Sequence, residues 1–334
     1  MEQCGQACRE AGIGQAGTST EQERYRHALA LTMMTTLKKN PAIVPLLAIA
    51  ACTLLVLLCG CTGKSADFSI DNPTEAPLNV RIDQTDHAIA PRSAQDVTLP
   101  AGRHTIEAPA LGKLDFIVYA QGRGGVINPT LSPYITINEV YARDDAAAKG
   151  FKPMHKTIQL DGVSFTGPFQ VNDQLFIEKS WQYGVHEDFP ASITSRDNNS
   201  KGNIHGKLFS KDEFVAYVEA AQDQPGRYAE HRSTVPAPKP NPVPAPVVLP
   251  VFADPQLEAV ALKMKALYAA YEKAEDPDEQ VRLSKSSHDL FMEFVKLQAP
   301  KAYKAPKEEN EKYNTLVFAL SDLLSRSARV VAKR

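Results

Sequence analysis

Hydrophobic and polar residues alternate in short runs through the middle of the chain. Phe68 and Ile70 are flanked by polar residues, and Asp71-Asn72-Pro73 ends that run. Alternation of this kind places one face of a strand in a core and the other face in water. We therefore predict an antiparallel β-rich domain over residues 61–233.

Further strand-like runs continue to about residue 193, and turn residues separate them. β-branched and aromatic residues, which favour strands, are frequent in these runs. One helix follows, because Ser210-Lys211-Asp212-Glu213 matches a capping box and an apolar stripe comes after it. The predicted strands cover residues 78–82, 97–99, 104–106, 115–119, 134–141, 157–160, 163–165, 169–171 and 175–177.

Four residues between two of these runs, Gly122-Arg123-Gly124-Gly125, allow two interpretations. A phosphate-binding loop needs a helix directly after it, and Val126-Ile127-Asn128-Pro129 does not start one. The sequence therefore favours a wide hairpin turn with glycines at positive φ.

Near the end of the chain the hydrophobic spacing changes to three and four residues, which is typical of amphipathic helices. Asp254-Pro255 and Asp276-Pro277 each combine an N-cap residue with a first-turn proline, and a third apolar stripe follows Pro306. Each stripe needs a partner that covers it, so we predict an antiparallel three-helix bundle over residues 255–334. A groove for a cofactor or partner is the alternative use of such stripes.

Residues 234–254 join these two regions and are rich in proline. Proline cannot donate to a strand ladder and favours the extended polyproline II conformation. About twenty such residues reach roughly 60 Å, so we predict a semi-rigid linker. A ligand for a proline-reading domain is the alternative. The predicted fold class is α+β: a membrane-proximal antiparallel β-rich domain, a proline-rich linker and a C-terminal three-helix bundle.

The longest apolar run of the chain, residues 42–58, lies before the β-rich domain. Lys38-Lys39 precedes it and Leu58-Cys59-Gly60-Cys61 ends it, an arrangement typical of a secretory signal. A transmembrane helix is the alternative, since about 18 apolar residues can span a bilayer. Pro45 interrupts the run, which favours the signal.

The closing residues Leu58-Cys59-Gly60-Cys61 resemble the lipobox of bacterial lipoproteins. The resemblance implies cleavage between Gly60 and Cys61 and attachment of diacylglycerol to the Cys61 thiol. In two-membrane cells, aspartate directly after the lipidated cysteine favours the inner membrane. Thr62 occupies that position here, so the resemblance implies an outer-membrane lipoprotein facing the periplasm.

Residues 1–32 show no hydrophobic periodicity. Because a signal normally begins near its positive charges, we expect translation to start at Met33 or Met34, with residues 33–60 as the signal peptide and 1–32 as a dispensable or wrongly assigned leader. A genuine long leader is the alternative.

A second, shorter resemblance covers residues 67–107. Val80-Arg81-Ile82-Asp83 and the run Leu99-Pro100-Ala101-Gly102-Arg103-His104-Thr105-Ile106 are similar to the PEGA-type β-module of bacterial envelope proteins. The tetrapeptide that names this module is absent. The resemblance implies an extracytoplasmic β-fold and no particular ligand.

Cysteine use and charge limit the chemistry of the mature chain. All five cysteines lie at or before Cys61, so after cleavage no disulfide, thiolate zinc site or cysteine nucleophile can form within the chain. Residues 1–60 hold five of the 37 basic and four of the 39 acidic residues, which leaves 32 basic and 35 acidic residues. This near-neutral balance gives no indication of nucleic-acid binding.

His186-Glu187-Asp188, close to Trp181, is the nearest approach to a catalytic or metal-binding group. Neighbouring residues on a strand point to opposite faces, so His186 and Glu187 share a site only at a turn or bulge. A solvated loop histidine is the simpler interpretation. We therefore assign no catalytic residue, no metal ligand and no cofactor.

The sequence thus predicts an exported, lipid-anchored protein of the bacterial cell envelope. We expect a non-enzymatic binding, tethering or bridging role, with the membrane as one partner and an envelope protein or cell-wall polymer as another. The alternative is an envelope hydrolase that acts on cell-wall or surface polymer, with a site near residues 181–188.

Overall fold

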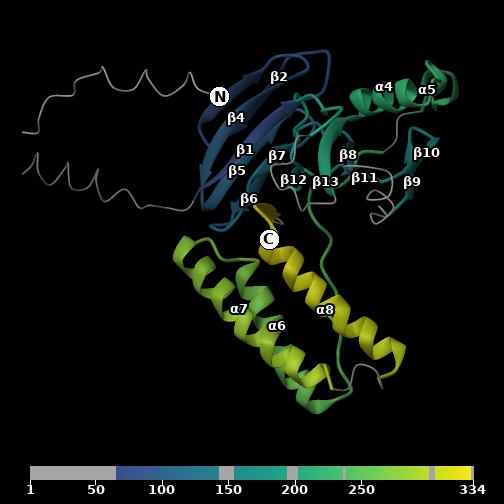
Figure 1. Ribbon diagram of the computed structural model, residues 1–334. Helices are drawn as coiled ribbons and strands as arrows, with labels where there is room; N and C mark the ends of the chain where they lie inside the picture. The colour runs from purple at the N-terminus through teal and green to yellow at the C-terminus, as the bar shows by residue number, and fades with distance from the viewer. Residues whose placement is uncertain (1–64, 143–153, 194–201, 236–237, 301–304, 332–334) are drawn as a thin grey trace, which may run out of the picture. The chain divides into compact units, whose positions relative to one another are not determined.

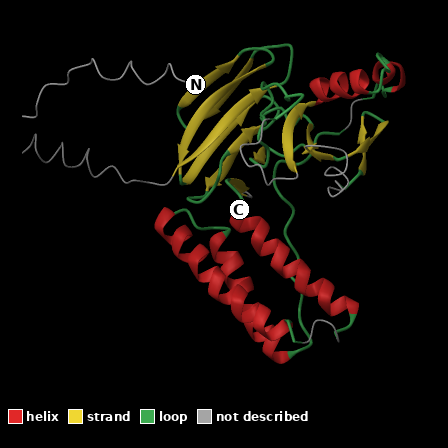
Figure 2. Ribbon diagram, viewed as in Figure 1, coloured by secondary structure: helices red, strands yellow, loops and turns green. Residues whose placement is uncertain are grey.

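A computed structural model describes residues 65–142, 154–193, 202–235, 238–300 and 305–331. These residues belong to one compact unit, which spans Gly63–Arg334. They form mixed α and β structure with several antiparallel sheets and five helices (Figures 1 and 2). The predicted α+β composition is therefore confirmed. The predicted leader, signal peptide and lipidation site lie outside the described residues.

Two sheets share the first hydrophobic core. One sheet has the strand order β12-β7-β1-β4, in which β1 pairs antiparallel with β4 and parallel with β7. The other has the order β14-β6-β5-β2-β3 and is antiparallel throughout. The strands of the first sheet are β1 (Ser65–Asn72), β4 (Ser93–Pro100), β7 (Gly125–Ile127) and β12 (Phe176–Glu178). Those of the second are β2 (Leu78–Ile82), β3 (Thr85–Ile89), β5 (Gly102–Ala108), β6 (Gly112–Val118) and β14 (Ala328–Val331).

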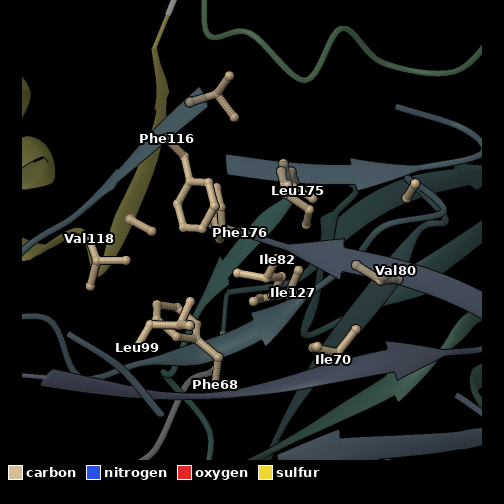
Figure 3. Close-up of a cluster of buried hydrophobic side chains, with 14 of the residues drawn as sticks. Phe68, Ile70, Val80, Ile82, Leu99, Phe116, Val118, Ile127, Leu175 and Phe176 are labelled. Carbon is tan, nitrogen blue, oxygen red and sulfur yellow. The ribbon is translucent and has the colours of Figure 1, made fainter. Parts of the chain in front are cut away.

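Alternating residues of both sheets fill this core, as the hydrophobic pattern predicts. Phe68 and Ile70 from β1 meet Phe116 and Val118 from β6 and Phe176 from β12 (Figure 3). Phe116 lies between His104 and Phe176, with ring centroids 5.4 and 4.9 Å away. The core is therefore built from residues that are far apart in the chain.

A third, three-stranded sheet has the order β11-β8-β13, and a separate hairpin pairs β9 with β10. The capping box at Ser210 starts α4 as predicted, and its apolar face packs over this sheet with Phe214 at the centre. The elements are β8 (Tyr134–Ala142), β9 (Lys156–Leu160), β10 (Val163–Gly167), β11 (Phe169–Asn172), β13 (Gly202–Ser210), α4 (Lys211–Ala221) and α5 (Arg227–His231).

The remaining helices are α6 (Pro255–Tyr271), α7 (Pro277–Gln298) and α8 (Lys307–Ser325). Asp254 and Asp276 cap α6 and α7 with their side chains, as their sequence positions predict. The three helices share one hydrophobic cluster, which also includes Ile117 and Tyr119 from β6 and the residue after it. These helices therefore pack on the second sheet.

Polar groups complete this contact at a place that we call the junction, formed by Gln280, Ser327 and the backbone around residues 118–124. Gln280 accepts a hydrogen bond from the Ala120 amide at 2.7 Å and donates to the carbonyls of Val118 and Ala274 at 3.2 and 2.8 Å. The Ser327 hydroxyl accepts from the Gly124 amide at 2.9 Å and donates to its carbonyl at 3.1 Å. Both side chains are fully enclosed.

The structure differs from the sequence prediction in two of these regions. Residues 328–331, expected within the helical bundle, form β14 beside β6. Gly124 and Gly125 have positive φ as predicted, but they lead into β7 beside β1 and not into a hairpin. A Cβ on Gly124 would lie 1.7 Å from the Asp67 carbonyl oxygen, so glycine is required by the close approach of two strands.

The proline-rich segment has no helix or strand among its described residues. It nevertheless contacts both regions that it joins. Lys239 donates to the Thr130 carbonyl at 3.1 Å, Val243 packs against the core of the two sheets, and Phe252 lies in the helix cluster. The segment therefore contacts the β-rich region and the helix cluster at several points along its length.

Candidate functional site

The outer face of β1 carries the polar residues that alternate with its core residues. Ala66, Phe68 and Ile70 point into the core, so Asp67, Ser69 and Asp71 point to the opposite face. There they line an open cavity of about 1000 Å³. We call this cavity the groove; its lining includes Asp67, Ser69, Asp71, Arg92, Asp96, Thr98, Lys179, Trp181, His186 and Glu187.

His186 lies at the end of the groove where β1 ends. Its Nε2 atom is 2.6 Å from Asp71 Oδ1, and the Tyr134 hydroxyl donates to Asp71 Oδ2. The Asp71 side chain is only 1% exposed, whereas that of His186 is 39% exposed. A buried carboxylate therefore holds an imidazole that solvent and ligands can reach.

Burial also affects the phenol of this group. Desolvation raises the pKa of Tyr134 well above its usual value, and the negative charge of Asp71 raises it further. Tyr134 therefore keeps its proton and acts as a hydrogen-bond donor to Asp71. This fixed donor leaves the other carboxylate oxygen to His186.

A buried lysine fixes the turn that carries His186. Lys207 Nζ on β13 donates to the backbone carbonyls of Gly184, Val185 and Glu187 at 2.8, 3.0 and 2.6 Å. Burial of the ammonium group lowers the Lys207 pKa, and nearby carboxylates partly oppose that shift. Lys207 therefore ties three carbonyls of the turn that carries His186 to β13.

The three residues that the sequence singled out do not form one constellation. His186 and Glu187 both line the groove, because residues 184–187 form a turn, the condition expected from the sequence. The Glu187 carboxylate turns back and accepts from the Gly184 amide at 2.6 Å. Asp188 is exposed and is not part of the lining. Within the described residues, no group of His, Cys, Asp or Glu side chains is arranged to hold a metal ion.

The turn of residues 184–187 forms one wall of the groove, and Trp181 packs behind this wall. Its side chain is buried in a small cluster with Val126, Tyr134, Val185 and Leu208, and one part of it borders the groove. The indole therefore supports the turn that carries His186 by packing against Val185. A change inside the groove also changes the environment of the indole.

The sequence did not indicate Asp71, Tyr134 or Lys207. Asp71 belonged to a segment expected to break a strand, and it lies 115 residues before its partner His186. One signal existed: Asp71 continues the alternation of Asp67 and Ser69 on the polar face of β1. That alternation shows that Asp71 lies on the polar face of β1, but it does not show that His186 is its partner.

No family model, curated protein or solved structure matches this chain. Of the helices in the described ranges, none has the length and apolar character needed to cross a membrane.

Proposed function

We propose that the protein is an exported lipoprotein of the bacterial cell envelope, anchored through a lipid on Cys61. The support is the sequence pattern of residues 38–61, with Gly60 and Cys61 at the cleavage point. Only four residue steps separate Cys61 from Ser65, where β1 begins. Such a stretch spans at most about 14 Å, so the β-rich region of an anchored protein stays next to the membrane. The position of Thr62 supports the outer membrane, facing the periplasm.

The anchored protein acts as a non-enzymatic binding or bridging protein, and the groove on β1 is its binding site. The observation that carries this proposal is the open, polar groove whose wall is fixed by Lys207. A site that is already ordered loses less entropy on binding. Two of its carboxylates, Asp67 and Glu187, already accept hydrogen bonds within the protein, which suits recognition of a ligand more than proton transfer.

In the proposed architecture the three C-terminal helices form a bundle that the proline-rich linker joins to the β-rich domain. The shared cluster of α6, α7 and α8 supports the bundle, as do the stacked rings of Phe294 and Tyr313, 5.0 Å apart. The contacts of Lys239 and Val243 support a linker that lies along its neighbours. The bundle thereby offers a second surface for bridging.

A hydrolase is the second candidate, because a specific observation favours it. A histidine held by a buried carboxylate, which a tyrosine also binds, is the arrangement expected of a general base that activates water. His186 also lies in an open cavity with several carboxylates, as a site acting on cell-wall or surface polymer would require.

Lipidation is tested by Cys61→Ser in the full chain, followed by metabolic labelling with a lipid precursor and by mass spectrometry. The variant is expected to lose the label and to remain an unprocessed precursor. Cleavage at the same bond, together with unchanged membrane association, would contradict the lipoprotein proposal.

The two candidate activities are separated by incubating the purified chain with cell-wall polymer and measuring both bound protein and released fragments. A binding protein is expected to co-sediment with polymer and release no fragments. Release of fragments that His186→Gln abolishes would favour the hydrolase.

A further inference from the structure

The floor of the groove is a ladder of polar side chains on two paired strands. Asp67 lies opposite Thr98 in the register of β1 and β4, and Ser69 lies opposite Asp96. Thr98 Oγ1 donates to Asp67 Oδ1 at 2.7 Å. Within the described chain, the Ser69 hydroxyl and the Asp96 carboxylate make no side-chain hydrogen bond. These two groups are therefore available to a ligand.

The charges of the groove disfavour an anionic ligand, and its hydrogen-bonding groups favour a ligand that can both donate and accept. An anionic ligand would meet an excess of carboxylates in a confined space, which is unfavourable. A purely cationic ligand would leave the Lys179 ammonium, which makes no ion pair within the described chain, without an acceptor; the charge of Arg92 is already paired with Glu75, to which Arg92 donates at 2.8 Å. The lining holds four carboxylates and two permanent cations, namely Asp67, Asp71, Asp96, Glu187, Arg92 and Lys179.

A neutral ligand can satisfy carboxylates and an ammonium together only if it both donates and accepts hydrogen bonds. Hydroxyl groups do both, and those of a sugar are repeated along its length. We propose that the groove binds a neutral saccharide, whose hydroxyl groups donate to Asp67 and Asp96 and accept from Lys179. This inference rests on the binding function proposed above and names the ligand class of the same site.

The size and rigidity of the groove agree with this ligand. A cavity of about 1000 Å³ holds several sugar rings, since small-molecule sites range from about 300 to 1000 Å³. Its floor is a paired strand and its wall is fixed by Lys207, so the acceptors keep their spacing when the groove is empty. Weak individual hydrogen bonds can then act together on one ligand.

Trp181 provides a direct measurement, because it is the only tryptophan of the chain and it borders the groove. The full chain, purified in detergent, is titrated with fully N-acetylated chitotetraose, called chitotetraose below, as the neutral probe and with tetragalacturonate as the anionic probe. We expect saturable change of the Trp181 emission with chitotetraose and none with tetragalacturonate. A stronger response to tetragalacturonate, or no response to chitotetraose, would overturn the proposal.

Asp96→Asn tests the predicted acceptor. The substitution removes the negative charge of an exposed carboxylate that accepts a hydrogen bond from a sugar hydroxyl, and is expected to weaken chitotetraose binding about tenfold without altering the unfolding curve. Asp289→Asn on the exposed face of α7 is the matched control and is expected to bind as the wild type does. Equal binding by both variants would contradict the role of Asp96 and the assigned ligand orientation.

The saccharide can come from a free glycan or from a glycolipid of the membrane that holds the anchor. Vesicles of phosphatidylcholine with and without glucosyl diacylglycerol are compared with the soluble tetramer. A response at lower sugar concentration on glycolipid vesicles identifies the lipid-linked source, and the reverse order identifies the free glycan. Failure of lipidation would appear separately in the mass of the chain, whatever the Trp181 titration shows.

Discussion

The junction and the groove both bury polar side chains, but they leave them in different states. At the junction, Gln280 and Ser327 are enclosed and bind backbone groups on both sides of the contact. In the groove, Asp71 is equally buried, yet its partner His186 is 39% exposed. The same chemistry therefore stabilises a contact in one region and presents an accessible imidazole in the other.

The difference lies in where the hydrogen bonds end. A buried polar network that closes on the backbone adds order and offers nothing to a ligand. A network that ends on a half-exposed side chain has a similar desolvation free energy, but it also presents a fixed donor or acceptor that a ligand can reach. Substitutions at the junction are thus expected to lower stability most, and substitutions in the groove are expected to change binding with smaller losses of stability.

The largest effect is expected for Gln280→Leu. The substitution leaves the Ala120 amide and the carbonyls of Val118 and Ala274 without their partner in a buried place. Each such group costs about 1 to 3 kcal/mol, so the free energy of unfolding should fall by at least about 3 kcal/mol in urea titrations. Gln256→Leu, at an exposed position of α6, is the control. Equal, small losses for both variants would show that the junction is not a stabilising contact.

Tyr134→Phe is expected to cost less, about 2 kcal/mol. It removes one donor from the buried carboxylate of Asp71, and hydrogen bonds to charged groups contribute about 1.5 to 3 kcal/mol. Urea unfolding measures the loss, and Tyr183→Phe serves as the control, since the Tyr183 hydroxyl makes no hydrogen bond with the described residues. If Tyr134→Phe leaves the free energy of unfolding unchanged, the Asp71 carboxylate is hydrated in solution and does not depend on Tyr134 as a donor.

Lys207→Met is expected to lower stability by about 1 to 2 kcal/mol while weakening ligand binding more than Tyr134→Phe does. Three carbonyls of the His186 turn lose their common donor, but two of these residues, Gly184 and Glu187, are near enough to the surface for water to replace it. Urea unfolding and the Trp181 titration measure the two effects. Unchanged binding would mean that the turn holds its position without Lys207.

The smallest effect is expected at Glu178, which accepts from the Ser327 amide at 2.8 Å. Burial raises the pKa of Glu178 above its usual 4.5, and hydrogen bonds from Ser327 partly oppose this. A raised folded-state pKa means that protonation contributes stability below pH 4.5, and this contribution is lost as pH rises through the folded-state pKa.

Glu178→Gln is neutral at every pH and still accepts through its amide oxygen. Its stability relative to the wild type should therefore be lowest below pH 4.5 and should rise toward neutral pH, as measured by urea unfolding at both conditions. A difference that does not change with pH would contradict the assigned shift.

Local patterns predicted much of the fold. The parity of Phe68 and Ile70 identified the core face of β1, and Asp254, Asp276 and Ser210 each start a helix as their side chains predict. These features depend on residues within a few positions of one another, so a short stretch of sequence is sufficient. The identity of the elements follows from local chemistry.

Partners across the chain could not be predicted in this way. His186 was identified as a candidate, but its neighbour Asp71 is brought to it by the pairing of β1 with β7 and of β7 with β12, which has no local signature. The β14 strand was missed for the same reason. Ala328 and Val330 alternate with polar or half-exposed residues only briefly after a helix. The pairing with β6 is what makes this segment a strand.

That pairing has a consequence for the order in which the protein can fold. β14 contributes Ala328 and Val330 to the core of the two sheets, yet about 210 residues separate it from β6. A chain that is delivered from its N-terminus, whether by the ribosome or through a membrane pore, must wait for α6, α7 and α8 before this core can close. Until then, the edge of β6 is an unpaired template beside other unfolded chains. The protein therefore has its greatest need of a chaperone late in delivery, when most of its strands are already present.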